Sequence, residues 1–425
     1  MKVHLQYGHS GLDIEIPFSD VNILQPRFIP GLADEQINFH KACRSPVESP
    51  PLKDLVDSND HIAVVIPDGT RALPSDRLLQ WLFAELEHVP CQNYTVILGT
   101  GTHRPNTQEE IRDIVGSDIQ TRYKVINHNA FDETTMANTG FINELGTPLL
   151  MNKEYVQADK RILLGFIEPH FMAGFSGGYK AVFPAISDIA SILDYHRSEI
   201  IGDPHSTWGI PENNPTQDRI QQSGSALPVD FLINVTLNEH REITGFFCGE
   251  VNKAHKRGCI FAKETAMTPV EKLYPLVITS NSGFPLDQNL YQSVKGMVAA
   301  AEIVIESGTI ILAAECSDGF PSHGNFARLV FEHDSPQAML ETVHKPGFRL
   351  LDQWQIQKLA QVQLKAQVAV YSEISDEEIK RASLEPVADL NAHLLNLRNQ
   401  LGDVPVAVLP EGPLTIPFFH PTDLD

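Results

Sequence analysis

The chain has 425 residues, which is more than a single hydrophobic core usually holds, so two domains are expected. Hydrophobic residues make up 42% of the sequence and charged residues 20%, a composition that excludes a disordered chain. The net charge of −22 argues against nucleic acid and anionic membrane surfaces as partners, and an anionic substrate would need a local cluster of Lys, Arg or backbone N–H groups.

The first residues, MKVHLQYGHSGLDIEIP, lack the apolar segment of a secretion signal, and no run approaches the ~18 apolar residues of a membrane span. The five cysteines are scattered and form no CxxC motif, a pattern typical of reduced thiols. We therefore expect a cytoplasmic protein without a membrane partner.

Three apolar runs, each followed by a glycine-bearing loop and then by a helical pattern, predict buried parallel strands. In chain order these runs are 61–66, 94–98 and 161–167. Ser75 is a candidate cap of the first helix, and Thr107 with Glu110 has the spacing of a capping box. A hairpin is expected over 231–250, with its turn at 238–240, followed by a helix over 251–266.

A second unit is predicted to begin near residue 269. Its expected strands begin at 274, 307, 367 and 404, and its expected helices cover 290–305, 334–345, 351–365 and 375–384. The expected fold is α/β, with two domains, Rossmann-like parallel sheets and the active site in the interdomain cleft. We assign 1–268 and the tail 406–425 to an N-terminal catalytic, cofactor-binding domain, and 269–405 to a C-terminal domain.

Polar side chains follow four of these strands, where ligands of open parallel sheets bind. The four loops carry Asp68 and Arg71; Thr100, Gly101, His103 and Arg104; Glu168, His170 and Lys180; and Asp287 and Gln292, with Lys295 just inside the next helix. The segment 165–186, GFIEPHFMAGFSGGYKAVFPAI, mixes glycines with His170 and Lys180 in an apolar run. This mixture indicates a backbone that comes close to a ligand, with two side chains that reach it.

The spacing of known phosphate motifs does not fit. GTGTHRP has Pro105 near the place of the third glycine of a dinucleotide fingerprint. GFSGGYKA has Ala181 where a P-loop has the Mg²⁺-binding Ser or Thr, so an NTPase is not expected. The glycines before Lys180 can still offer backbone N–H groups to an anion.

Each candidate side chain has a structural alternative. His103 and His170 would suit a reaction that needs a base on each face of one carbon, or they are hydrogen-bonded structural histidines. Lys180 is a phosphate clamp, an amine for covalent attachment, or a surface lysine. His196, at a predicted helix end, either compensates the helix dipole or binds a metal. Arg71 could grip a carboxylate as a fork, or it is an exposed charge.

Six segments together resemble the lactate racemase family, whose enzymes use a nickel-pincer nucleotide. They are PDGTR (67–71), TGTHRP (100–105), GFIEPHFMAGFSGGYK (165–180), DYH (194–196), GFPLDQNLYQSVKGM (283–297) and DQW (352–354). The resemblance runs in the same order from about residue 60 to about residue 360, and the combination of motifs is specific.

The resemblance implies a pyridinium-3-thioamide-5-thiocarboxylic acid mononucleotide that carries nickel. It implies that Lys180 is joined to this cofactor, that His196 completes the nickel coordination, and that His103 and His170 are the catalytic pair. The positions that match the family's substrate or cofactor contacts are Arg71, Tyr291, Gln292 and Lys295, together with Trp354, Asp68, Thr100, Gly101, Gly177 and Gly178. The implied partners are a 2-hydroxy acid and the enzymes that make the cofactor.

The implied reaction inverts C2 of a 2-hydroxy acid by reversible hydride transfer to the cofactor. The chain differs from the family pattern at Tyr179, at Ala181 and over 315–326, so a larger or more polar acid, including an aldonic sugar acid, is as credible a substrate as lactate. Two alternatives are a lyase or epimerase that uses the same histidines for direct deprotonation, and a nucleotide-binding sensor.

Overall fold

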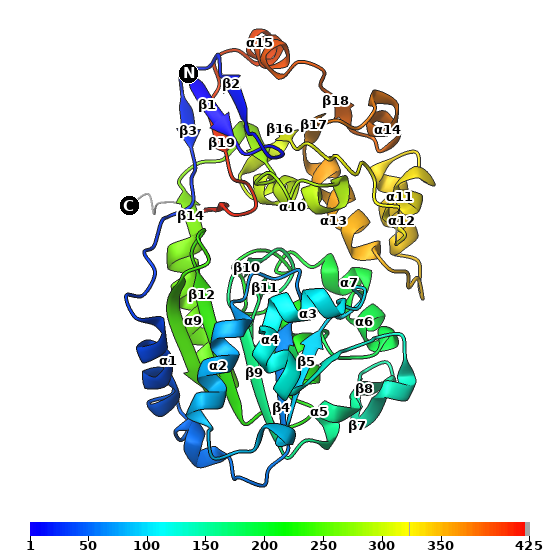
Figure 1. Cartoon of the computed structure of the whole chain (residues 1–425). Coiled ribbons are helices and arrows are strands. Elements are labelled where there is room, and N and C mark those ends of the chain that lie inside the picture. Colours follow the sequence, from blue (N-terminus) through cyan, green and yellow to red (C-terminus); the bar gives the residue numbers. More distant parts are fainter. Residues whose placement is uncertain (323, 421–425) are drawn as a thin grey trace. The chain divides into compact units, whose positions relative to one another are not determined.

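The computed structural model describes residues 1–322 and 324–420, and the chain divides into two compact units. The N-terminal unit comprises Phe28–Tyr195 and Gly209–Thr265. The C-terminal unit comprises Met1–Arg27, His196–Trp208 and the described chain from Ala266 onward (Figure 1). The two-domain α/β architecture with parallel sheets that the sequence predicts is confirmed.

The N-terminal unit is built on a six-stranded sheet with the order β13-β12-β9-β4-β5-β6. Neighbouring strands are parallel apart from β13, which pairs antiparallel with β12. The strands are β4 (Ile62–Pro67), β5 (Tyr94–Gly99), β6 (Lys124–Asn127), β9 (Lys160–Phe166), β12 (Phe231–Leu237) and β13 (Ile243–Gly249). Because β9, β4 and β5 are adjacent and parallel, the loops that follow them leave the same edge of the sheet.

Helices and two short antiparallel strand pairs surround this sheet. The helices are α1 (Glu35–Arg44), α2 (Ser75–Glu85), α3 (Gln108–Val115), α4 (Ser117–Arg122), α5 (Lys153–Gln157), α6 (Ile189–Tyr195), α8 (Pro215–Gly224) and α9 (Val251–Ala266). The pairs are β7 (Met136–Ile142) with β8 (Pro148–Asn152), and β10 (Pro169–His170) with β11 (Gly174–Phe175).

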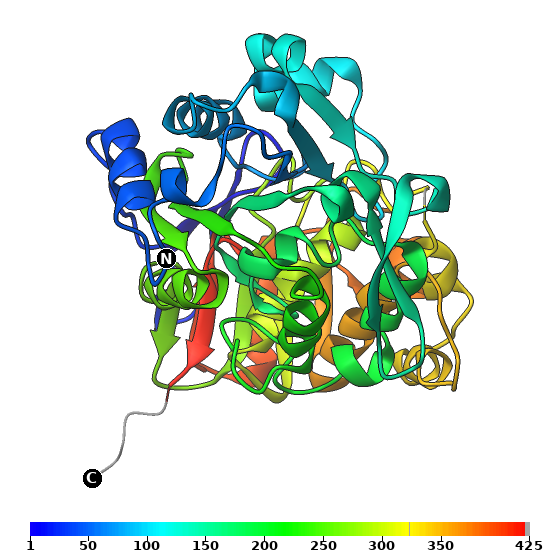
Figure 2. The same ribbon diagram turned by 90° about the horizontal axis from the view of Figure 1, so that it is seen from below.

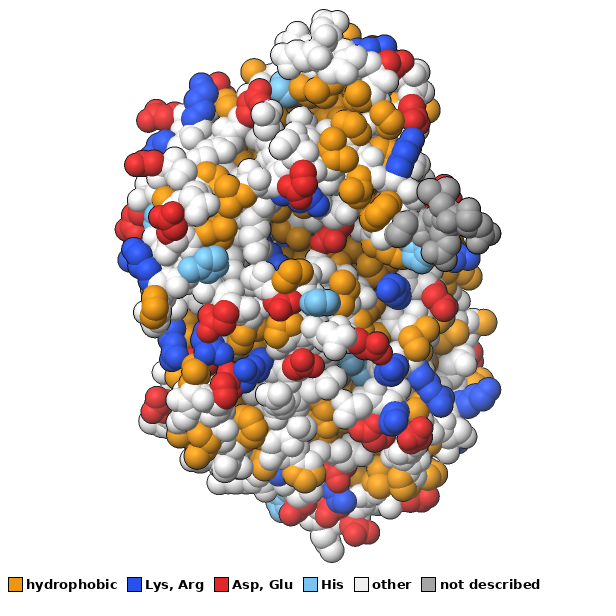
Figure 3. Space-filling model, turned by 180° about the vertical axis from the view of Figure 1, so that it is seen from behind, with side chains coloured by type: hydrophobic (Ala, Val, Ile, Leu, Met, Phe, Trp, Pro, Cys, Tyr) orange, Lys and Arg blue, Asp and Glu red, His pale blue; other side chains and the backbone are white. Residues whose placement is uncertain are grey.

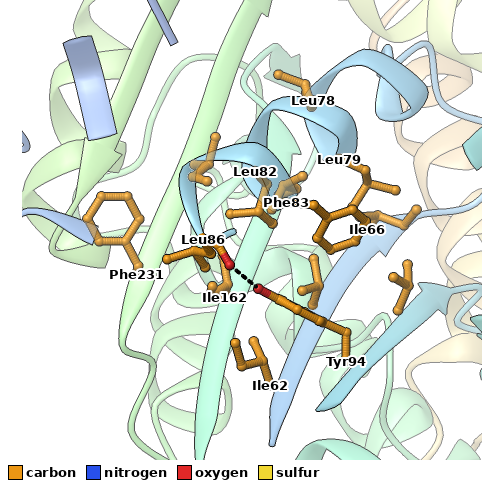
Figure 4. Packing of buried hydrophobic residues seen from close by; sticks show 14 of the residues in the cluster. Ile62, Ile66, Leu78, Leu79, Leu82, Phe83, Leu86, Tyr94, Ile162 and Phe231 are labelled. Atoms are coloured by element: carbon orange, nitrogen blue, oxygen red, sulfur yellow. Dashed lines mark hydrogen bonds between the residues drawn. The ribbon is translucent and has the colours of Figure 1, made fainter. Parts of the chain in front are cut away.

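Side chains that alternate along β4 supply a different core on each face of the sheet. Ile62 and Ile66 pack in a cluster with Leu78 and Leu82 of α2, as Figure 4 shows. Ala63 and Val65 belong to the opposite cluster, which includes residues of α8 and α9. Helices therefore cover both faces, which explains why these strands read as continuous apolar runs (Figure 2).

The C-terminal unit is built on a six-stranded sheet in which all neighbours are parallel, in the order β18-β17-β16-β15-β19-β3. Its strands are β3 (Val21–Ile23), β15 (Tyr274–Ser280), β16 (Val304–Ala313), β17 (Gln367–Tyr371), β18 (Glu385–Pro386) and β19 (Val406–Leu409). Smaller pairs are β1 (Lys2–Leu5) with β2 (Leu12–Glu15), and β14 (Met267–Val270) with β20 (Ile416–Phe419). The helices are α7 (Ser198–Ile201), α10 (Leu290–Ala301), α11 (Phe326–Phe331), α12 (Pro336–Val343), α13 (Gln353–Lys365), α14 (Asp376–Arg381) and α15 (Leu390–Leu401).

Most predicted elements are present where the sequence placed them. The hairpin of β12 and β13 is confirmed, and α9 has the predicted bounds. Thr107 and Glu110 form the predicted capping box of α3. Ser75 is not a cap: it is the first residue of α2, and the residue before it makes no side-chain capping bond.

The contact-based units differ from the expected domain assignment in three segments. Residues 1–27, residues 196–208 and the tail from 406 were expected with the N-terminal domain, but they belong to the C-terminal unit. β19 pairs with β15, and β3 pairs with β19. Residues 421–425 of the tail lie outside the described residues. The last change of unit falls at Thr265–Ala266, close to the expected boundary at 268.

Within the described ranges, no helix is long and apolar enough to cross a membrane. On the face drawn in Figure 3, acidic and basic side chains are interspersed with hydrophobic ones, so the negative net charge is not gathered in one patch there.

Candidate functional site

The loops after β4 and β5 place a carboxylate beside an imidazole. Asp68 is buried directly after β4, and its Oδ2 lies 2.7 Å from Nδ1 of His103. Its Oδ1 accepts hydrogen bonds from the hydroxyl and the backbone N–H of Thr70, at 2.6 and 3.2 Å. Burial raises the pKa of Asp68, but the bonds from His103 and Thr70 and the charge of Arg71 outweigh it and lower the pKa. The carboxylate is therefore ionised near neutral pH and orients the His103 ring.

The backbone after β5 turns at Gly101, whose φ is +54°. A Cβ there would meet nothing within 4 Å, so the backbone conformation, not the available space, favours glycine. The N–H of Gly101 donates to the carbonyl of Ala185 at 2.9 Å, and the hydroxyl of Thr100 donates to the carbonyl of His128 at 2.7 Å. These bonds fix the loop, and the side chain of His103 projects from it with 50% of its surface exposed.

The loop after β9 folds into the short pair β10–β11 and carries His170. Nδ1 of His170 accepts hydrogen bonds from the backbone N–H groups of Met172 and Ala173, both at 3.2 Å. Gly174 closes this turn with a φ of +76°, and a Cβ there would lie 2.4 Å from the carbonyl oxygen of Ile210. The ring of His170 is therefore held by the turn that it begins.

Arg71 and Glu168 connect the loops after β4 and β9. Nη1 of Arg71 lies 3.8 Å from Oε1 of Glu168, and the two side chains are 37% and 41% exposed. A solvated ion pair of this kind stabilises a fold only slightly. The guanidinium fork of Arg71 is thus suited to exchange this contact for the carboxylate of a substrate.

Lys180 lies in the 3₁₀ turn Gly178–Ala181, half-buried. Gly177 and Gly178 have φ values of +82° and +55°. The N–H of Gly178 donates to Oδ1 of Asn234, a buried residue of β12, at 2.8 Å. A Cβ on Gly178 would lie 2.9 Å from the ring of His255 of α9. The glycines thus let the turn pack closely on two polar side chains beneath it.

His255 supports the same turn in its neutral form. Burial lowers its pKa, and the hydrogen bond with Ser176 opposes this effect without reversing it. Nε2 of His255 lies 2.8 Å from the carbonyl oxygen of Ser176, so Nε2 carries the proton. Sequence reasoning missed His255 and Asn234, although Asn234 stands out as an amide within the apolar strand FLINVTL.

In the C-terminal unit, three of the predicted site residues form one cluster. The ring centroids of His196 and Trp354 are 4.1 Å apart, with 33° between the ring planes. Nε1 of Trp354 donates to the hydroxyl of Tyr291 at 3.2 Å. The amide of Gln353 donates to the carbonyl of His196 at 2.7 Å, which fixes the backbone of the buried histidine.

Helix α13 also holds the segment that follows His196. The side chains of Gln357 and Lys358 donate to the carbonyls of Ser198 and Ser206, both at 2.8 Å. Sequence reasoning did not single out Gln353, Gln357 or Lys358. The signal was the run QWQIQK, which puts amides and an ammonium on a helix that is buried nearly all round.

Gln292 and Lys295 lie on the first turns of α10. Nζ of Lys295 donates to Oε1 of Gln292 at 2.7 Å. Asn289 caps this helix by accepting from the N–H of Gln292 at 3.0 Å. Asp287, which precedes the helix, is buried, and its Oδ2 accepts from the backbone N–H of Gly8 at 2.7 Å, which indicates a structural role.

The predicted site residues thus fall into two groups, each described within its own unit. The N-terminal unit brings together Asp68, Arg71, Thr100, Gly101, His103, His170, Gly177, Gly178 and Lys180 on the loops after β4, β5 and β9. The C-terminal unit holds His196, Tyr291, Gln292, Lys295 and Trp354.

The chemistry of the available donors agrees with a metal that arrives with its own ligands. Within 1–322 and 324–420, no three His, Cys, Asp or Glu side chains gather as a metal site. An imidazole such as His196 suits nickel, but one protein ligand needs further donors from a bound small molecule. A cofactor that holds nickel through sulfur and carbon would supply these donors, so the residues present fit such a group.

Comparison with known proteins agrees with the sequence resemblance. Residues 7–209 match the model of the lactate racemase N-terminal domain, and residues 271–416 match that of the lactate racemase C-terminal domain. The chain is 33% identical to a lactate racemase of Thermoanaerobacterium thermosaccharolyticum over 419 residues, which cover 96% of this chain and 97% of the relative. It is also 33% identical to a lactate racemase of Lactiplantibacillus plantarum, over 81% of each chain.

Solved structures show the same similarity. The lactate racemase apoprotein of T. thermosaccharolyticum superposes with a TM-score of 0.90 at 32% identity, covering 98% of this chain and 100% of that one. A Thermotoga maritima protein shares the fold with a TM-score of 0.69 at 16% identity, covering 92% of this chain and 100% of that one. The chain therefore belongs to the lactate racemase family of isomerases.

Proposed function

We propose that the protein interconverts the two configurations at C2 of a 2-hydroxy acid, with lactate as the first candidate because both relatives are named lactate racemase. The observation that carries the proposal is the pair of histidines, His103 and His170, on loops that leave one edge of the sheet. His103 is additionally oriented by the ionised carboxylate of Asp68, 2.7 Å away. A protein that only bound a nucleotide would have no need of this arrangement.

The proposed cofactor is the nickel-pincer nucleotide, held covalently by Lys180 and through nickel by His196. Trp354 would pack beside it, as it packs beside His196, and the backbone around Thr100, Gly101, Gly177 and Gly178 would line its pocket. When bound, this cofactor supplies an electron sink that can take up the C2 hydrogen with its electron pair.

The side chains of the protein would bind the acid and handle the proton of its hydroxyl group. Arg71, Gln292, Lys295 and Tyr291 are the proposed substrate contacts. The hydroxyl proton passes to an imidazole, and Asp68 stabilises the positive charge that then develops on His103. A histidine alone is far too weak a base to remove the C2 hydrogen as a proton, which is why direct deprotonation is the less favoured route.

A substrate panel in deuterated buffer tests the proposal with cofactor-loaded enzyme. Both enantiomers of lactate, larger 2-hydroxy acids and aldonic acids are each incubated, and C2 configuration and deuterium content are measured. We expect inversion with C2 largely unlabelled. Deuterium at C2 would instead indicate direct deprotonation, and nucleotide binding without turnover of any acid would indicate a sensor.

One departure from the family pattern, Tyr179, lies next to Lys180 in the turn Gly178–Ala181. Tyr179 is partly buried and packs against the core cluster that includes residues of α8 and α9, and a Cβ on Gly224 would lie 2.6 Å from Cβ of Tyr179. This residue thus fills the core between the turn and α8. Since this side chain packs on the core, it is not one of the proposed substrate contacts, and the panel has to identify the substrate.

The two cofactor attachments are tested separately from activity. Intact mass should show an adduct on protein made together with the cofactor-synthesis enzymes, and Lys180→Ala should remove that adduct. Elemental analysis should show nickel in wild type and its loss in His196→Ala. His205→Ala, a change of an exposed histidine in the same segment, is the matched control and should keep its nickel. An unmodified, fully active chain would contradict the tether.

A further inference from the structure

The two candidate catalytic histidines use the same ring nitrogen for opposite kinds of hydrogen bond. Nδ1 of His103 lies 2.7 Å from the carboxylate of Asp68. An ionised carboxylate only accepts hydrogen bonds, so Nδ1 of His103 must donate. Nδ1 of His170 lies 3.2 Å from two backbone N–H groups, and these only donate, so Nδ1 of His170 must accept.

A neutral imidazole has one N–H and one bare nitrogen, so these contacts fix where each proton sits. In His103 the proton is on Nδ1, and Nε2 carries a lone pair that can take up a proton. In His170 the proton is on Nε2, and the lone pair is already engaged on Nδ1. The two rings therefore present different chemistry at Nε2.

The turn after His170 makes this assignment difficult to reverse. Met172 and Ala173, whose N–H groups donate to the ring, are 4% and 0% exposed. The carbonyl of Met172 is tied to the amide of Asn214 at 2.9 Å, which holds the turn from its other side. If Nδ1 of His170 carried a proton, it would face these two buried N–H groups, and both hydrogen bonds would be lost.

We propose that the two histidines rest in opposite tautomers and are not interchangeable: His103 is the base of the resting enzyme, and His170 presents an N–H. This inference rests on the proposed function, because it assigns different roles to the two histidines of the proposed catalytic pair. The substrate hydroxyl gives its proton to Nε2 of His103, while Nε2–H of His170 donates a hydrogen bond. His170 becomes a base only when the turn at Met172 and Ala173 opens.

Nuclear magnetic resonance of the full chain, with ¹⁵N-labelled histidine and without cofactor, reads the tautomers directly. The spectra are recorded over a range of pH, and the tautomers are read where the two rings are neutral. His103→Gln and His170→Asn assign the signals by their disappearance. We expect Nδ1–H for His103 and Nε2–H for His170, the latter outnumbering its other tautomer by about tenfold or more.

Three variants test what fixes each tautomer. Asp68→Ala should move His103 toward the Nε2–H form, which free histidine prefers, and leave His170 unchanged. His170→Asn should keep its melting temperature close to wild type, since the Asn oxygen can accept bonds from backbone N–H groups two and three residues on, whereas His170→Ala should melt lower. Equal destabilisation of the two variants would contradict the acceptor role.

A shared tautomer for the two rings, or a protonated Nδ1 in His170, would overturn the inference. The tautomers are read without cofactor or substrate, so the result does not depend on turnover. Opposite tautomers in a protein that racemises no 2-hydroxy acid when loaded would overturn the proposed function alone.

Discussion

A buried ammonium holds the segment that carries His196, and its titration should be visible in the stability of the protein. Lys358 is 7% exposed, and its Nζ donates to the carbonyl of Ser206 at 2.8 Å. Burial lowers its pKa to about 8, while the charges of Glu302 and Asp203 offset only part of this effect. Burial also raises the pKa of Glu302, whose carboxylate is hydrogen-bonded to the hydroxyl of Thr207.

The sign of the effect follows from proton binding. Between about pH 8 and the reference value of 10.5, the unfolded chain binds a proton at Lys358 that the folded chain does not. The free energy of unfolding therefore rises with pH through this window, because the penalty for burying the charged form disappears. From pH 7 to pH 9 the contribution of this lysine changes by about 1 kcal/mol in favour of the folded state.

Lys358→Met removes the titration and leaves an apolar side chain of similar length. Urea unfolding of wild type and variant is compared at pH 7 and pH 9, with Lys345→Met, a change of an exposed lysine of the same unit, as control. Between pH 7 and pH 9, the free energy of unfolding of the wild type should rise by about 1 kcal/mol more than that of Lys358→Met. It should rise by the same amount as that of Lys345→Met. An unchanged difference would refute the assignment of a depressed pKa.

Three further variants test the supports of the predicted catalytic loops. Asn234→Ala leaves the N–H of Gly178 without its acceptor, so urea unfolding should show a loss of about 1–3 kcal/mol, and a loss below 0.5 kcal/mol would contradict it. Gly178→Ala adds a strained φ to a contact of 2.9 Å with the ring of His255, so it should lose more stability than Gly101→Ala, whose Cβ meets nothing. Gly101→Ala should lose about 1–2 kcal/mol from backbone conformation alone, and equal losses in the two glycine variants would refute the role of packing.

Local patterns in the sequence predicted the elements whose partners lie nearby in the chain. The capping box at Thr107 and Glu110 depends on residues three positions apart, and the hairpin at 231–250 depends on a short turn. The prediction for Ser75 was wrong because its hydroxyl lies 3.5 Å from the carbonyl of Leu73 and makes no bond to a helix N–H.

Pairing between distant segments was not predictable in this way. β3 and β19 are separated by nearly the whole chain, and nothing in either short apolar run specifies the other as its neighbour. The assignment of residues 196–208 to the C-terminal unit could not be predicted for the same reason. The hydrogen bonds that hold this segment run from the side chains of Gln353 and Gln357 to backbone carbonyls. Every residue has a backbone carbonyl, so the sequence of the segment does not show that it accepts these bonds.

The candidate site was predictable to the level of residue types, but not to the level of their protonation. Placement after adjacent strands selected Asp68, His103 and His170 from the sequence. The tautomers depend on whether a neighbour accepts or donates, and for His170 that neighbour is the backbone, which every residue possesses.

Polar side chains inside apolar helices and strands are a sequence signal that could have indicated which loops are held in place by hydrogen bonds. Asn234 in β12, His255 in α9 and Gln353 in α13 are all buried, and each bonds to the backbone of a loop that carries a candidate site residue. Most buried polar groups are hydrogen-bonded, so each of these side chains implies a hydrogen-bond partner nearby, which here is the backbone of a loop. Loops fixed by such bonds keep their side chains in place before a ligand arrives, which is what catalysis by positioned imidazoles requires.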